Sequence, residues 1–105
     1  MQIALDLDGT LAHYDGWQGV EHIGAPITEM MTKVYQWLDE GHDITIFTAR
    51  VSVESEAEEA ARHIIQWLAD NNLPPFPITC IKHKHFELFV DDRAKGVLKN
   101  CGVFL

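Results

Sequence analysis

The chain has 105 residues, a length that favours one domain spanning residues 1–105. Its residues are 47% hydrophobic and 23% charged, which is ordinary for a globular protein, and no apolar run is long enough to cross a membrane. The formal net charge of −8 argues against broad electrostatic attraction to nucleic acid or to anionic lipid, although a bound divalent cation would reverse the field locally for a phosphate-bearing substrate.

The first residues predict a strand rather than a signal peptide. No basic stretch precedes Asp6, and this acidic residue comes too early for the apolar segment of a signal peptide. Residues 2–7 instead predict a short buried strand that ends just before Gly9. We therefore expect a cytosolic protein.

Residues 11–25 follow this strand with no helical or strand-like period. They include Gly16, Gly19 and Gly24, and a structureless stretch of this length is unusual in so small a domain and is often functional. One interpretation is a lid whose Trp17 stacks on a substrate base or sugar. The alternative is local packing of aromatic rings that holds the loop on the domain.

Two amphipathic helices, with a strand between them, are predicted in the middle of the chain. Residues 26–40 place apolar side chains on one face at helical spacing, and Gly41 is a natural stop. Residues 43–48 predict a strand. Residues 53–71 predict a second helix whose early turns are acidic, as the helix dipole favours.

The last third of the chain predicts strands at 77–81 and 87–91, a helix at 93–100 and an edge strand at 103–105. Strands that alternate with helices indicate an α/β fold. We expect a three-layer, Rossmann-like arrangement with a mostly parallel sheet of five strands and helices on both faces. Ligands of such sheets bind beyond the carboxyl ends of the strands.

Polar residues fall at the ends of these predicted strands. Asp6 and Asp8 close the first strand, and Thr48 closes the second. Asp91 and Asp92 close the fourth strand, and Lys82 comes just after the third. Because a parallel sheet brings its carboxyl ends to one edge, we expect these side chains to meet there.

These residue types suit phosphoryl transfer. The carboxylate of Asp6 can attack phosphorus to form an aspartyl-phosphate, and Asp8 can protonate the leaving oxygen and later activate water. Crowded carboxylates repel one another, and Mg²⁺ relieves that repulsion, with Asp91 as the expected second carboxylate ligand. Thr48 offers a hydroxyl to the phosphoryl oxygens, and Lys82 offers a point charge.

Four short motifs also occur in order along the chain. Residues 6–10 read Asp-Leu-Asp-Gly-Thr, residues 48–50 read Thr-Ala-Arg, and Lys82 and the Asp91–Asp92 pair follow. Together they resemble the four motifs of the haloacid dehalogenase-like (HAD) superfamily, the first being its DxDGT signature. The resemblance spans nearly the whole chain.

Residues 15–17, 22–24, 26–27, 78–79 and 91–94 carry a closer resemblance. They look like those of short HAD-type proteins from bacteria and their phages, most of which are uncharacterised. No segment is long enough for the cap domain that many HAD proteins carry. The resemblance therefore implies a capless member with an open site.

The resemblance also implies residue roles. Asp6 is the nucleophile and a metal ligand, Asp8 is the general acid/base and binds the metal through its backbone carbonyl, and Asp91 completes the metal shell. An acid at position 8 is typical of the phosphotransferases of the superfamily, whereas its dehalogenases lack one. The resemblance implies that Thr48 and Lys82 bind the phosphoryl group, and the neighbouring Ala49 and Arg50 are further candidates for phosphate binding.

Three of these assignments have alternatives. Lys84 competes with Lys82 as the phosphate-binding lysine. Asp92 either joins the metal shell or caps a helix at 93–100. Arg50 either contacts the substrate phosphate or makes a surface ion pair.

Two functions are consistent with this pattern. The first is an Mg²⁺-dependent phosphatase acting on a phosphorylated small molecule or a nucleic-acid end, with nucleotides or polynucleotide ends as the preferred substrate class and no membrane partner. The second is a catalytically idle HAD-type module that binds without turnover. The sequence indicates neither the physiological substrate nor the oligomeric state.

Overall fold

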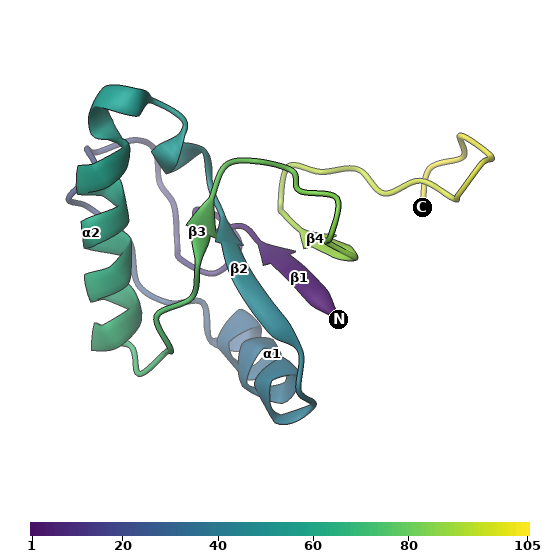
Figure 1. The fold of residues 1–105 in the computed structure, drawn as a ribbon, viewed down its shortest axis with the longest axis horizontal. Helices are drawn as coiled ribbons and strands as arrows, with labels where there is room; N and C mark the ends of the chain where they lie inside the picture. Colours follow the sequence, from purple (N-terminus) through teal and green to yellow (C-terminus); the bar gives the residue numbers. More distant parts are fainter.

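The computed structural model describes residues 1–105 as an α/β fold with a parallel sheet of four strands and two helices (Figure 1). In chain order the elements are β1 (Gln2–Leu5), α1 (Thr28–Asp39), β2 (Asp43–Phe47), the 3₁₀ turn η1 (Ala49–Val51), α2 (Glu54–Asp70), β3 (Ile78–Thr79) and β4 (Leu88–Val90). The strand order is β3-β2-β1-β4, and every neighbouring pair is parallel. The predicted α/β class is confirmed, with four strands in place of five. Neither helix combines the length and apolar character that crossing a membrane requires.

The central strand β1 sets the register of the sheet. Ile3 is paired with Ile44 of β2 and Leu88 of β4, and Leu5 is paired with Ile46. Because side chains alternate along a strand, these residues share one face of the sheet. That face holds the hydrophobic core, in which Ile3 and Leu5 are fully buried.

Both helices cover this same face. Val34 of α1 and Ile64 and Leu68 of α2 are fully buried and belong to one cluster with Ile3 and Leu5. The connections from β1 to β2 and from β2 to β3 step in the same direction along the sheet. Right-handed crossovers that step in one direction place their helices on one side, which explains the shared face.

The opposite face of the sheet carries no helix, so the expected layer on both faces is not found. The connection between β3 and β4 contains no helix that could cover it. Instead, Phe86 of this connection is buried against Phe89, and the Phe47 and Phe89 rings lie 5.7 Å apart. Three aromatic rings therefore provide the cover that the third layer was expected to supply.

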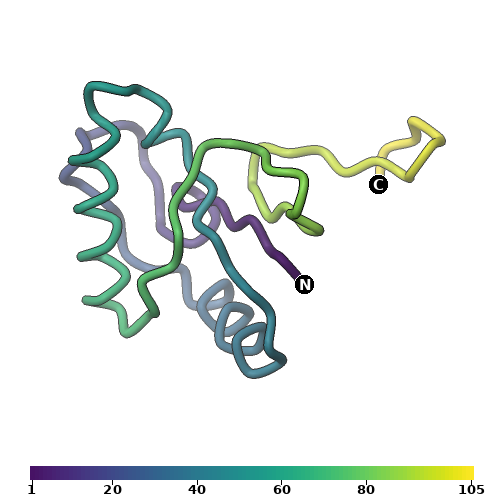
Figure 2. Tube along the Cα trace, in the orientation of Figure 1, coloured from purple at the N-terminus to yellow at the C-terminus, as the bar shows by residue number.

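The C-terminal residues 93–105 form an exposed arm, and the predicted helix at 93–100 and edge strand at 103–105 are wrong. An isolated bridge joins Val97 to Phe104, and the arm extends away from the sheet (Figure 2). Phe104 is 70% exposed, so the arm has no core to pack on. An isolated helix of eight residues is unstable in water without such packing.

The segment 11–25 contains no helix or strand, as its sequence predicts. Its two ends are joined to each other, because the amide of His13 donates to the carbonyl of Ala25 at 2.8 Å. The end near Gly24 is also fastened to α2, since Nε1 of Trp67 donates to the carbonyl of Gly24 at 2.8 Å. The segment consequently lies beside α2 (Figure 2).

Candidate active site

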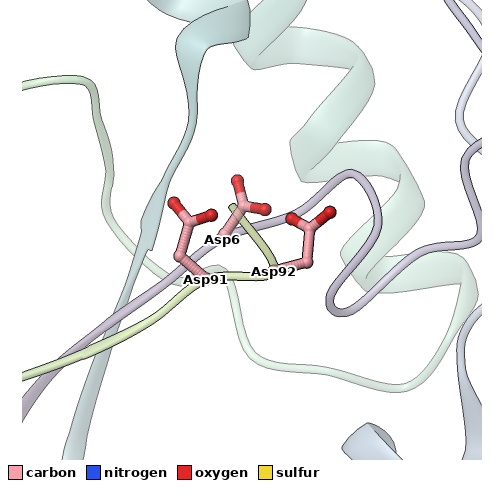
Figure 3. A group of neighbouring side chains, drawn as sticks. All are labelled: Asp6, Asp91 and Asp92. Carbon is pink, nitrogen blue, oxygen red and sulfur yellow. The ribbon is translucent and has the colours of Figure 1, made fainter. Parts of the chain in front are cut away.

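Three carboxylates gather at the carboxyl edge of the two adjacent strands β1 and β4. Asp6 directly follows β1, and Asp91 and Asp92 directly follow β4. One oxygen from each lies within 4.8 Å of the others, and the three side chains point to the same side, with Asp6 between the other two (Figure 3). The expected gathering of Asp6 with Asp91 is therefore seen, with Asp92 beside them.

The cluster is electrostatically crowded. Burial, a hydrogen bond with Asp92 and the charge of Asp91 raise the pKa of Asp6 from 3.8 to about 7, against a smaller lowering by Thr10. At neutral pH the carboxyl of Asp6 is therefore only partly ionised, and a bound cation would favour its ionised form. Three carboxylates offer the hard oxygen ligands that Mg²⁺ prefers, so the donor set fits that ion.

Thr10 connects two of the carboxylates. Its Oγ1 lies 3.1 Å from Oδ2 of Asp6 and 3.2 Å from Oδ1 of Asp92, and it accepts a hydrogen bond from the amide of Asp92 at 3.0 Å. A hydroxyl has one proton, so it donates to one carboxylate at a time. In the sequence Thr10 was noted only as the last residue of a motif, and no role for it was predicted. The available sequence signal for a role at the site was its place directly after Gly9.

Asp92 does not cap a helix, because no helix follows it. Its backbone and side chain are both held by Thr10, which directs its carboxylate toward Asp6. Asp91 accepts a hydrogen bond from the amide of Arg93 at 2.8 Å. This turn fixes the acidic pair just beyond the end of β4.

We expect Gly9→Ala to destabilise the fold by about 1–3 kcal/mol, because two requirements meet at Gly9. Its φ is +85°, and an added Cβ would lie 2.6 Å from Oδ2 of Asp92. Gly16→Ala is the matched control, since Gly16 also has positive φ, at +115°, but its Cβ would meet no atom within 4 Å. Urea unfolding measures both variants. Equal losses of stability would contradict a special close approach at Gly9.

Asp8 is paired with Arg50 and is not a member of the carboxylate cluster. Nε of Arg50 donates to Oδ2 of Asp8 at 2.7 Å, and Nη2 donates to Oδ1 at 2.9 Å. The Arg50 side chain is only 4% exposed, and that of Asp8 is 19% exposed. The surface ion pair considered for Arg50 is thus a partly buried, bidentate pair with Asp8.

Thr48 occupies the end of β2, as expected, and is buried. Its Oγ1 accepts a hydrogen bond from the amide of Arg50 at 3.2 Å, which caps η1. The proton of this hydroxyl remains available to another acceptor. Ala49, the first residue of η1, lies between Thr48 and Arg50 in the chain.

The three carboxylates line an open cavity of about 760 Å³ together with Asp8, Thr48 and Arg50. Two exposed rings of the segment 11–25 form part of its wall: Tyr14 is 44% and Trp17 is 54% exposed. The predicted site residues among its lining are Asp6, Asp8, Trp17, Thr48, Ala49, Arg50, Asp91 and Asp92. The cavity therefore joins the carboxylates to an aromatic wall.

Neither candidate lysine lines this cavity. The Nζ of Lys82 lies 5.1 Å from the centre of the Phe89 ring, on the sheet face that lacks a helix, and Lys84 is exposed. A flexible lysine stem readily follows apolar surface in this way. The structure thus brings together every predicted site residue except the lysines.

Among solved structures, the chain is similar to that of a conserved protein from Bacteroides thetaiotaomicron. The two share 25% sequence identity with a TM-score of 0.60, over 90% of this chain and 77% of that one. No protein-family model and no curated protein matches the sequence. The structural likeness supports the α/β fold.

Proposed function

We propose that the protein is a capless, HAD-type, Mg²⁺-dependent phosphohydrolase that cleaves phosphomonoesters through an aspartyl-phosphate on Asp6. One observation carries the proposal: carboxylates from the ends of two adjacent parallel strands converge within 4.8 Å, at a cavity that also holds Asp8 and Thr48. The fold would be a reduced form of the HAD arrangement, with four strands instead of five.

The metal would be held by the carboxylates of Asp6 and Asp91 and by the backbone carbonyl of Asp8, with Asp92 next to them. When bound, it supplies positive charge that keeps Asp6 ionised and offsets the charge of the phosphate. The raised pKa of Asp6 supports this requirement, because burial and the neighbouring Asp92 and Asp91 all disfavour its charged form.

The reaction would take place in two steps. The Asp6 carboxylate attacks phosphorus, the ester P–O bond breaks, and Asp8 gives a proton to the leaving oxygen. Water then attacks the phosphorus of the aspartyl-phosphate and passes a proton to Asp8. This attack breaks the bond between phosphorus and Asp6, releases phosphate and regenerates the Asp6 carboxylate. The hydroxyl proton of Thr48 is free to donate to a phosphoryl oxygen.

The substrate class we favour is a nucleotide or the phosphorylated end of a nucleic acid. The cavity is open, with no cap over it, so a large leaving group can extend into solvent. Tyr14 and Trp17 present exposed rings on its wall, on which a base could stack. The negative charge of the whole chain argues for recognition at an end rather than along a strand.

Trp17→Ala is expected to raise KM for a nucleoside monophosphate about tenfold, because stacking on an aromatic ring contributes roughly 1–3 kcal/mol per base. KM for p-nitrophenyl phosphate should change much less, since this smaller ring reaches less of the wall. Steady-state kinetics with both substrates measure the difference, and Trp17→Phe is the matched control that keeps a ring. Equal effects on both substrates would indicate that Trp17 only packs the loop.

The alternative is a catalytically idle module of the same fold. It is favoured by one observation, the absence of a lysine from the cavity wall beside the carboxylates. Such a protein would bind Mg²⁺ and phosphate without turnover.

Turnover separates the two proposals. Phosphate release should be measured with Mg²⁺ over nucleotides, sugar phosphates, phosphorylated DNA ends and p-nitrophenyl phosphate. We expect hydrolysis that chelation abolishes. No turnover on any of these substrates, together with measurable Mg²⁺ binding, would favour the idle module.

A further inference from the structure

We propose that Arg50 is a positioning residue that fixes Asp8 and the loop carrying Trp17 to the same scaffold. The inference has two parts, the positioning of Asp8 and the positioning of the loop. The part about Asp8 rests on the proposed function, because it assumes that Asp8 is the general acid/base. In this proposal Arg50 binds Asp8 and the loop, and it does not make the contact with the substrate phosphate that one interpretation of the sequence expected.

The guanidinium of Arg50 is nearly saturated by protein groups. It makes two bonds to Asp8, Nη2 also donates to the carbonyl of His22 at 2.8 Å, and Nη1 donates to the carbonyl of Val20 at 3.3 Å. Four of its five N–H groups therefore have partners. With a side chain 4% exposed, Arg50 has little capacity left for a phosphate.

The remaining contact of this guanidinium is with the aromatic wall. Its Cζ lies 4.9 Å from the centre of the Trp17 ring, a cation–π distance. One face of Trp17 is thus held by Arg50, while the residue stays 54% exposed and lines the cavity. The ring is fixed in place, and part of its surface is left for a ligand.

The base of Arg50 is anchored independently of the loop. Its amide donates to Thr48 Oγ1 at the end of β2, and the turn leads directly into α2. The loop residues 17–22, by contrast, lie outside any helix or strand. Loop and acid therefore take their positions from one side chain on a rigid support, and its removal should disturb both.

This arrangement predicts a dependence on the leaving group that a purely structural arginine would not produce. General acid help matters most for a poor leaving group such as an alkoxide and little for p-nitrophenolate. We expect Arg50→Met to lower kcat for glycerol phosphate about 100-fold and kcat for p-nitrophenyl phosphate less than about tenfold. Arg50→Lys keeps the charge without the bidentate geometry and should fall between Arg50→Met and the native protein.

A double-mutant cycle with Asp8→Asn tests the link directly. If Arg50 acts through Asp8, adding Arg50→Met to the Asp8→Asn variant should lower kcat for glycerol phosphate by less than about threefold. Arg62→Met is the matched control, because Arg62 pairs with Glu58 on the exposed surface of α2, and it should leave kinetics unchanged. Circular dichroism checks that each variant is folded. If Arg50→Met does not fold, Arg50→Lys takes its place in the cycle.

Iodide quenching of Trp17 tests the positioning of the loop without turnover. The Trp17 signal is obtained by subtracting the emission of Trp17→Phe from that of the parent protein, and we expect quenching to increase in Arg50→Met and Arg50→Lys but not in Arg62→Met. Unchanged quenching, equal losses on both substrates, or full additivity with Asp8→Asn would each overturn the inference. If the native chain shows no turnover, the proposed function fails, and so does the part of the inference that concerns Asp8. The quenching result then decides by itself whether Arg50 positions the loop that carries Trp17.

Discussion

Asp6→Asn is expected to lower phosphate-ester hydrolysis about 10⁴-fold or more, because an amide cannot serve as the nucleophile that forms the acyl phosphate. The substitution is nearly isosteric, so it should leave the cavity and the Thr10 contact largely in place. Phosphate release from p-nitrophenyl phosphate with saturating Mg²⁺ measures the effect. Residual activity within about tenfold of the native protein would remove Asp6 from the role of nucleophile.

The stability of the metal-free protein provides the control for this loss. Burial and the neighbouring Asp92 and Asp91 raise the pKa of Asp6 from 3.8 to about 7. A raised carboxyl pKa gives stability that is complete below the unfolded pKa and is lost as the pH rises through the folded pKa. Asparagine does not ionise, so the variant should be more stable than the native protein above pH 7.

The expected gain in unfolding free energy is about 1–2 kcal/mol at pH 8 and close to zero at pH 4, discounted for the partial exposure of Asp6. Urea unfolding in EDTA at both pH values measures it. Added Mg²⁺ should reverse the order, because the native protein keeps the stronger ligand set. A variant that is less stable than the native protein at pH 8 would contradict the crowding of the three carboxylates.

Asp8→Ala is expected to lower kcat by roughly 10²–10³-fold while leaving phosphate binding nearly unchanged, which is the range for loss of general acid/base help. Asp8 is not in the carboxylate cluster, so Mg²⁺ and phosphate should still bind to the remaining groups. Inhibition by inorganic phosphate measures binding, and kcat measures turnover.

Asp8→Asn is the matched variant, because it keeps an oxygen acceptor for the buried guanidinium of Arg50. If Asp8→Ala lost activity only through an unpaired Arg50, the asparagine variant would retain turnover. An unchanged kcat in both variants would remove the acid/base role, and a parallel loss of phosphate binding would place Asp8 in the binding site instead.

Much of the site could be predicted because it depends on where strands end. The apolar run before Asp6 and the second apolar run before Asp91 both predict strands, and parallel neighbours place their carboxyl ends at one edge. The same logic placed Thr48 at the end of β2. These positions follow from local pattern and from the topology of α/β folds, without knowledge of any side-chain contact.

The lysine and the C-terminal arm could not be predicted in this way. Lys82 follows β3 in sequence, as expected, but the short connection to β4 lies over the uncovered sheet face and its Nζ approaches Phe89. Residues 93–105 have the apolar content of a helix and an edge strand. Without a surface to pack on, that content is not enough to form either element.

The sequence by itself determined the α/β class, the two helices, the irregular segment 11–25 and the strand ends that carry the acidic residues, because periodicity and strand order act through neighbours in the chain. Only the tertiary structure decided which side chains are partners. Thr10 meets Asp92 across 82 positions, and Arg50 meets Asp8 across 42. Such contacts depend on how packed elements are oriented, and no local pattern of residues encodes that geometry.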